Sequence, residues 1–196
     1  MKPARPTPAP ASADRAPRDV DLVRACAAGE SAALGELFDR HHLVVFRFLS
    51  RLLGASSADL DELVNETFLH VFRSARSFRG QASARTWICA IAANVGRHHV
   101  RSESRRRSFL DSLRGCLPTR TADANQVNER RDLLRRLGRV VSVLPHDLRV
   151  VYVMCDVEEI PGVEVAEVLG VPEGTLWRRL HQARRSLRAA LDGGAR

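Results

Sequence analysis

The sequence has almost no lysine, few aromatic residues and only four cysteines. Lys2 is the only lysine among 31 basic residues, and aromatic residues make up 5% of the 196 residues. The cysteines are far apart and form no C-x-x-C pair, which argues against a zinc knuckle or a disulfide framework. No apolar run approaches the length of a membrane span, and no signal-peptide core is present. We therefore expect a cytoplasmic protein without metal, cofactor or membrane insertion.

The chain also lacks the alternating pattern of β-strands, hairpin turns, a nucleophile motif and a Gly-rich phosphate loop. Hydrophobic residues instead recur at spacings of three and four, which predicts an all-α fold. A loss of periodicity between Asp111 and Glu129 indicates an interdomain linker, and five prolines among the first eighteen residues indicate a disordered tail. The predicted divisions are a tail (1–18), a first helical domain (19–108), a flexible linker (109–128) and a second helical domain (129–192).

Charge is unevenly distributed along this basic chain, which has a net charge of +8 and a pI of about 10.7. Residues 20–72 hold eight acids and four arginines, whereas residues 73–107 hold nine arginines and one acid. Residues 145–173 hold seven acids and one arginine, and an arginine-rich segment follows them. Such segregation predicts one basic face in each domain and a polyanionic partner.

The segment "EVAEVLGVPEGTLWRRL" has the pattern of a helix-turn-helix, with a turn at Gly170 and Pro172 at the start of the second helix. A core stripe is predicted at Leu176, Leu180, Ala183, Leu187 and Leu191. On the outer side, base edges would meet Trp177, Arg178, His181 and Gln182, and phosphates would meet Arg179, Arg184, Arg185 and Arg188. The alternative interpretation is a solvated basic face on an ordinary surface helix.

The segment "SFRGQASARTWICAIAANVGRHHVR" combines a glycine-bearing loop with a basic helix, an arrangement suited to single-stranded nucleic acid. Asn94 is a candidate because an amide beside an apolar stripe needs a partner. Trp87 has the spacing of a core residue rather than a stacking platform. The candidate residues in this segment are Phe78, Arg79, Gln81, Ser83, Asn94, Arg97 and Arg101.

These motifs, with "DLVRACAAGESAALGELFDRHH", "DLDELVNETFLHVFR" and "LPHDLRVVYVM", resemble the extracytoplasmic-function (ECF) sigma factors of bacterial RNA polymerase. The resemblance covers residues 19 to about 191. It implies a non-catalytic initiation subunit whose first domain (sigma region 2) binds core polymerase and melts the downstream promoter element. Its second domain (sigma region 4) would recognise the upstream element as duplex DNA. The loop at residues 78–83 would then capture a flipped base, with help from Asn94.

The resemblance also implies partners. Asp61, Glu62, Asn65 and Glu66 in "DELVNETF" would contact the clamp helices of the largest polymerase subunit, where an acidic segment suits a basic partner. The second domain would bind the flap of the second-largest subunit, and linker residues such as Arg120 would run toward the RNA exit path. An anti-sigma factor is a further candidate partner, although no residue identifies it.

Two departures from the family pattern stand out. Many relatives have glutamine where Asn65 stands, and relatives often have Gly-x-Ser where Glu159, Ile160 and Pro161 stand. Pro161 would replace the missing hydroxyl cap at the start of the helix. The main alternative function is a dimeric helix-turn-helix repressor or activator, which would need a further domain and would leave residues 79–107 without a role. A hydrolytic or metal-dependent enzyme is the third alternative.

Overall fold

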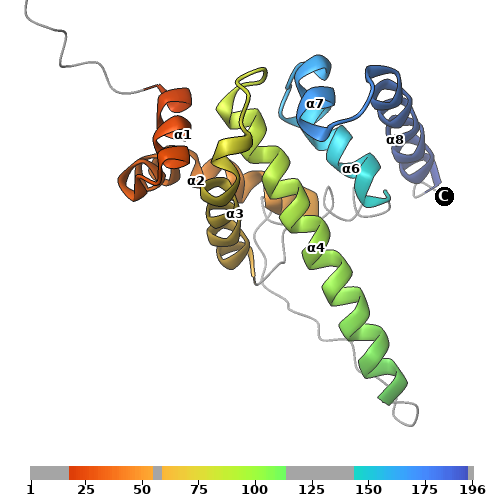
Figure 1. Ribbon diagram of the computed structural model, residues 1–196. Helices are drawn as coiled ribbons and strands as arrows, with labels where there is room; N and C mark the ends of the chain where they lie inside the picture. The colour runs from red at the N-terminus through yellow and green to blue at the C-terminus, as the bar shows by residue number, and fades with distance from the viewer. Residues whose placement is uncertain (1–17, 55–58, 114–143, 194–196) are drawn as a thin grey trace, which may run out of the picture.

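The computed structural model describes residues 18–54, 59–113 and 144–193, and these residues form helices joined by turns, with no strand among them (Figure 1). The prediction of an all-α chain is confirmed for this part. Predicted tail residues 1–17 and linker residues 114–128 lie outside the described residues. Within the described ranges, no helix is both long and apolar enough to cross a membrane.

Domain 1, the described residues up to 113, contains four α-helices and one short 3-10 turn. They are α1 (Asp19–Ala28), α2 (Ser31–Leu53), α3 (Leu60–Ser74), η1 (Ala75–Ser77) and α4 (Ala84–Leu113). Gly29 ends α1 in the left-handed conformation, with φ of 95°, which glycine adopts without a Cβ penalty. The apolar stripes of the helices meet in a core in which Leu37, Phe48 and Leu49 are fully buried.

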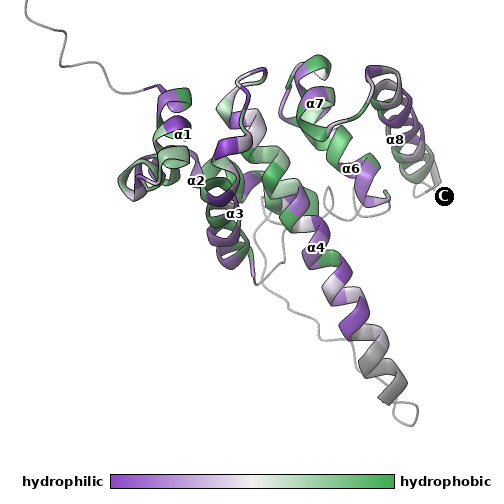
Figure 2. Cartoon of the chain, in the orientation of Figure 1, coloured by the Kyte–Doolittle hydropathy of each residue, from purple (hydrophilic) through white to green (hydrophobic). Residues whose placement is uncertain are grey.

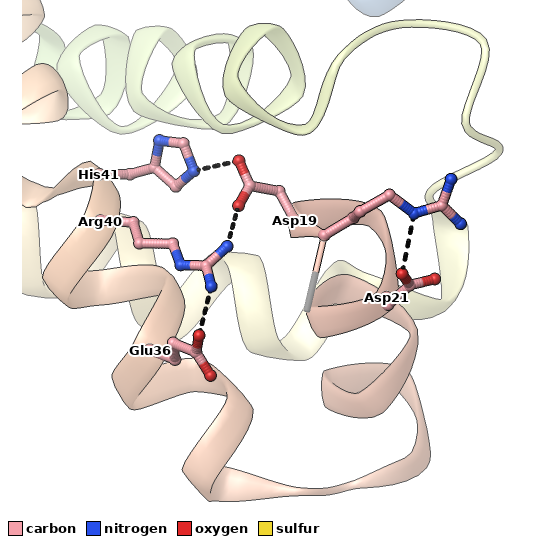
Figure 3. A network of polar contacts seen from close by, with 6 residues as sticks. Asp19, Asp21, Glu36, Arg40 and His41 are labelled. Atoms are coloured by element: carbon pink, nitrogen blue, oxygen red, sulfur yellow. Dashed lines mark hydrogen bonds and ion pairs between the residues drawn. The ribbon is translucent and has the colours of Figure 1, made fainter. Parts of the chain in front are cut away.

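A network of polar contacts ties the start of α1 to α2 (Figure 3). Asp19 accepts a hydrogen bond of 2.8 Å from Arg40 and contacts Nε2 of His41 at 2.8 Å. Partial burial opposes ionisation of Asp19, but the hydrogen bonds from Arg40 and His41 outweigh it and lower the pKa of the carboxyl group. Arg40 also donates to Glu36, one turn earlier in α2. These contacts hold the first residue of α1 against α2.

Helix α4 is longer than the periodicity predicts. It continues to Leu113, five residues into the segment assigned to the linker. Its C-terminal half extends away from the other helices and is hydrophilic around Arg101, Arg105 and Arg106, all of which are exposed (Figures 1 and 2). Among its described side chains, residues 99–106 and Ser108, this half of α4 has no continuous apolar stripe to bury.

Domain 2, residues 144–193, contains α6 (His146–Tyr152), a π-helical turn η2 (Val153–Val157), α7 (Gly162–Leu169) and α8 (Glu173–Gly193). The predicted core stripe of α8 is confirmed at Leu176, Leu180, Ala183 and Leu187, which are buried. Leu191 belongs to the predicted stripe, but it is 60% exposed, one turn beyond Leu187. Between η2 and α7, Glu159 has a left-handed backbone with φ of 54°.

The two domains pack directly against each other, which the sequence pattern does not predict. Helix α7 lies against α4, and η2 lies against α2. Met154, Ile160 and Val165 of domain 2 belong to the same buried cluster as the core of domain 1. Arg149 reaches across the boundary and donates a hydrogen bond of 2.8 Å to the carbonyl of Leu52. The described domains therefore form one continuous packed body.

Candidate nucleic-acid and polymerase interfaces

Helices α7 and α8 form the predicted helix-turn-helix. Gly170 ends α7 in the left-handed conformation, with φ of 63°, and Val171 donates a hydrogen bond of 3.0 Å to the carbonyl of Ala166. Gly162 fits beneath the indole of Trp177, because a Cβ on this glycine would lie 2.7 Å from a ring carbon. The contact joins the first turn of α7 to the first turns of α8.

The outer face of α8 is exposed, as predicted, but its arginines differ in their partners. Arg178, Arg185 and Arg188 are exposed and form no ion pair with another described residue, and His181 and Gln182 are also exposed. Trp177 is 50% exposed.

Two of the predicted phosphate contacts already have carboxylate partners. Arg184 donates to Asp156 through Nε and Nη2 at 2.8 and 2.6 Å, and this contact raises its pKa. Arg179 lies 3.9 Å from Asp147. The sequence pattern cannot show these pairs because the partners lie 28 residues (Arg184 and Asp156) and 32 residues (Arg179 and Asp147) apart in the chain. Arg185 and Arg188 are the better candidates for phosphate contacts.

The second set of candidates is divided between the loop after η1, which holds Phe78, Arg79, Gln81 and Ser83, and α4, which holds Asn94, Arg97 and, on its projecting half, Arg101. We call Phe78, Arg79, Gln81, Ser83, Asn94, Arg97 and Arg101 the loop–α4 face. Gly80 turns the loop with φ of 73°, and the Phe78 ring packs on Trp87 with centroids 5.1 Å apart. The Ser83 hydroxyl accepts a hydrogen bond of 3.0 Å from the Thr86 amide, so Ser83 caps α4. Trp87 contacts the loop through Phe78 and packs against the core of domain 1, but it is only partly buried.

Asn94 is exposed, so the argument that its amide needs an internal partner was wrong. It lines a hollow between the domains, together with Arg97 of α4, Asp147 and Arg179. A second hollow is lined by Phe78, Arg79, Gln81 and Trp87 from the loop side and by Glu167, Val168 and Gly170 from the helix-turn-helix. Domain 2 therefore borders the loop–α4 face, although Arg79, Gln81, Ser83, Asn94 and Arg101 are exposed.

A half-buried histidine, His146, also lies at the domain boundary. Nε2 of His146 hydrogen-bonds the carbonyl of Ala93 at 3.1 Å, while Nδ1 is buried with no hydrogen-bond partner among the described residues. Desolvation lowers the pKa of His146 to about 4, and the charges of Arg97 and Arg149 act in the same direction. Asp147 and the Ala93 carbonyl oppose that shift. The neutral imidazole therefore stabilises the packed arrangement.

The third candidate surface is on α3. Asp61, Glu62, Asn65 and Glu66 are all exposed, whereas Leu63, Val64, Thr67 and Phe68 face the core. Asp61 and Asn65 border a mainly apolar groove whose other walls are Phe38, His42, Leu43, Phe46 and Val64. Leu43 is 57% exposed there. An apolar centre with polar residues at its rim is common in protein-binding surfaces.

Comparisons with known proteins agree with this geometry. The family model for Sigma-70 region 2 matches residues 37–106, and the model for Sigma-70 region 4 matches residues 134–187. The chain is 30% identical to the ECF RNA polymerase sigma factor SigM of Mycobacterium tuberculosis over 86% of this chain and 82% of that protein. The chain belongs to the ECF sigma factors of RNA polymerase. It is thus a non-catalytic subunit of transcription initiation.

Two further relatives extend the comparison. SigE of Mycolicibacterium smegmatis is 31% identical over 83% of this chain, which spans 64% of that protein's length. Among solved structures, CnrH in complex with the cytosolic domain of CnrY covers 89% of this sigma factor and 97% of the solved chain, with a TM-score of 0.64 and 26% identity. The sigma factor RpoE of Bartonella quintana, solved with the anti-sigma factor NepR, shares the fold at 16% identity and a TM-score of 0.59.

Three carboxylates of this sigma factor make contacts that the sequence analysis missed. Asp147, Glu158 and Glu164 of domain 2 bind side chains or backbone of domain 1. The run of seven acids in residues 145–173 was the available signal, but it did not show where the acids point.

Proposed function

We propose that this sigma factor binds core RNA polymerase through α3, recognises the upstream promoter element through α8 and holds the melted downstream element on the loop–α4 face. The supporting observation is α8 itself, which buries its apolar stripe and presents Arg178, His181 and Gln182 on a helix-turn-helix. A helix of this kind enters the major groove with its N-terminal half, so these side chains would meet base edges.

We further propose that the acidic face of α3 and the adjoining apolar groove bind the clamp helices of the largest polymerase subunit. Domain 2 would bind the flap of the second-largest subunit, and an anti-sigma factor would be a second type of partner. Replacing Asp61 and Glu62 by lysine should abolish binding to core polymerase, because like charges would then face each other.

The control for this reversal is Glu30→Lys with Glu173→Lys, two exposed acids away from α3 that give the same change of net charge. A pull-down with core polymerase at moderate salt measures both variants. Equal retention of the two double variants would refute the docking assignment.

The role of the loop–α4 face is tested by Asn94→Ala. The variant should assemble into holoenzyme normally and form fewer open complexes, since a methyl group cannot hold an extruded base through hydrogen bonds. Permanganate reactivity of promoter thymines measures opening. Ser104→Ala, at an exposed position on the projecting half of α4, is the control. Wild-type reactivity in the Asn94 variant would refute this role.

A further inference from the structure

One arginine of α8 is already bound by an acid of its own domain. Arg184 donates hydrogen bonds through Nε and Nη2 to the two carboxylate oxygens of Asp156, at 2.8 and 2.6 Å. Asp156 lies in the π-helical turn η2, and its side chain is 20% exposed, whereas that of Arg184 is 50% exposed. The two residues therefore form a bidentate ion pair at the edge of the surface that α8 presents to solvent.

The position of Arg184 on α8 places it beside side chains that are candidates for DNA contacts. Arg188 lies four residues later and His181 three residues earlier, so the three side chains share one side of the helix. Arg188 and the adjacent Arg185 are exposed and form no ion pair with another described residue. A DNA backbone that meets Arg188 therefore passes within one helical turn of Arg184.

Asp156 occupies the donors that a phosphate group would use. A carboxylate and a phosphate accept hydrogen bonds from the guanidinium fork in the same bidentate manner, so Nε and Nη2 of Arg184 cannot bind both at once. The carboxylate also cancels the positive charge of Arg184, and a neutralised side chain releases no counterion from DNA. Arg184 must therefore leave Asp156 before it can make a full phosphate contact.

A second acid lies beside α8, but its contacts extend to both domains. Asp147 lies 3.9 Å from Nη2 of Arg179 and 2.8 Å from Nη2 of Arg97, which belongs to domain 1. Replacing Asp147 would disturb two pairs at once. The hydrogen bonds of the Asp156 carboxylate go to Arg184, so a substitution of Asp156 isolates one pair.

We infer that Asp156 is a positioning residue that holds Arg184 away from the DNA backbone and thereby lowers the affinity of α8 for DNA of any sequence. This inference rests on the proposed function of α8. The chain has a net charge of +8, so a further phosphate contact would strengthen its binding to all DNA alike. With Arg184 withheld, the candidate base contacts Arg178 and His181 contribute a larger share of the binding energy.

The test uses the whole chain and a fluorescein-labelled DNA duplex of randomised sequence, because the outer face of α8 is exposed in this chain. Fluorescence anisotropy measures the dissociation constant between about 50 and 200 mM salt. Asp156→Asn removes the negative charge at nearly constant size, and Asp156→Glu keeps the charge. Glu159→Gln is the matched control, because Glu159 is an exposed acid three residues away and its replacement gives the same change of net charge. Circular dichroism verifies that each variant remains helical.

We expect Asp156→Asn to bind the duplex up to about eightfold more tightly at about 0.1 M salt, the value of one additional phosphate contact. The slope of the logarithm of its binding constant against the logarithm of the salt concentration should become steeper by roughly 0.9. Asp156→Glu should bind less tightly than Asp156→Asn because it keeps the pair, and Glu159→Gln should match wild type. Adding Arg184→Ala to Asp156→Asn should restore the wild-type slope, because the additional contact belongs to Arg184.

Weaker binding by Asp156→Asn would overturn the inference, since Asp156 would then orient Arg184 toward DNA or support the fold. Unchanged affinity and slope would overturn it as well, and so would an equal gain for Glu159→Gln. Arg185→Ala on the same duplex separates these failures from a failure of the proposed function. If Arg185→Ala weakens binding, α8 contacts DNA and only the role of Asp156 is lost. If neither Arg185→Ala nor Asp156→Asn changes binding, the assignment of α8 to DNA is lost too.

Discussion

Replacing Gly162 by alanine should destabilise the helix-turn-helix, although alanine is the better helix former. The added Cβ would lie 2.7 and 2.8 Å from two ring carbons of Trp177 and 3.2 Å from a methyl carbon of Leu176. Leu176 is fully buried and has no room to move, whereas Trp177 is 50% exposed and can swing outward. The indole would then lose its packing contact with Gly162 of α7.

The magnitude follows from the buried part of the indole. A tryptophan that buries about half of its 150–250 Å² loses roughly 1–2 kcal/mol when most of that contact is broken, at about 25 cal/mol per Å². The higher helix propensity of alanine offsets at most about 1 kcal/mol of this loss, and less in the first turn of a helix. We expect Gly162→Ala to cost about 1 kcal/mol of unfolding free energy, a net value from these two effects.

Urea unfolding followed by circular dichroism measures this cost, and two variants test its cause. Gly174→Ala, in the first turn of α8 with open space around its Cβ position, should be neutral or stabilising. In a Trp177→Ala background, Gly162→Ala should cost much less, since only the 3.2 Å contact with Leu176 remains. If Gly162→Ala destabilises equally with and without Trp177, the packing explanation is refuted.

Three further outcomes are expected. Glu159→Gly should be neutral or raise the free energy of unfolding, measured in urea, by up to about 1 kcal/mol. Glycine relieves the strain of the left-handed backbone, and this gain exceeds the cost of the greater entropy of glycine in the unfolded chain. A clear loss of stability would contradict this. The free energy of unfolding should not depend on His146 above the ordinary histidine pKa of 6.5. It should fall by up to about 3 kcal/mol as the pH drops toward the folded-state pKa of about 4, because the unfolded chain takes up the proton first. His146→Gln should remove this part of the pH dependence. Arg178→Ala should lower the binding free energy by about 1–3 kcal/mol and relax selectivity at one promoter position in a selection on randomised upstream elements. Arg185→Ala should instead weaken binding to all sequences alike and flatten the salt dependence of binding. If Arg178→Ala leaves the selected sequence unchanged, Arg178 contacts the DNA backbone and not a base.

The sequence alone was sufficient for several features that depend on one helix and its nearest turn. The spacing of Leu176, Leu180 and Leu187 predicted which side of α8 is buried, because a helix repeats every 3.6 residues whatever surrounds it. Gly170 predicted the turn, because glycine adopts the left-handed conformation at no cost. The acidic segment of α3 was identified through the resemblance to the ECF sigma factors, and the structure places Asp61, Glu62 and Glu66 on its exposed side.

The tertiary structure decided which charged groups remain available. Arg184 and Arg185 are neighbours with the same chemistry, yet Asp156, 28 residues away, binds only Arg184. Glu158 and Glu164 looked like ordinary surface acids until the packing of domain 2 placed them against Arg85 and Ser83. Helical periodicity describes the faces of one element, whereas an ion pair needs two elements brought to within about 4 Å by the rest of the fold. For this sigma factor, local sequence determined the two faces of α8, and tertiary packing determined which of its arginines already have a carboxylate partner.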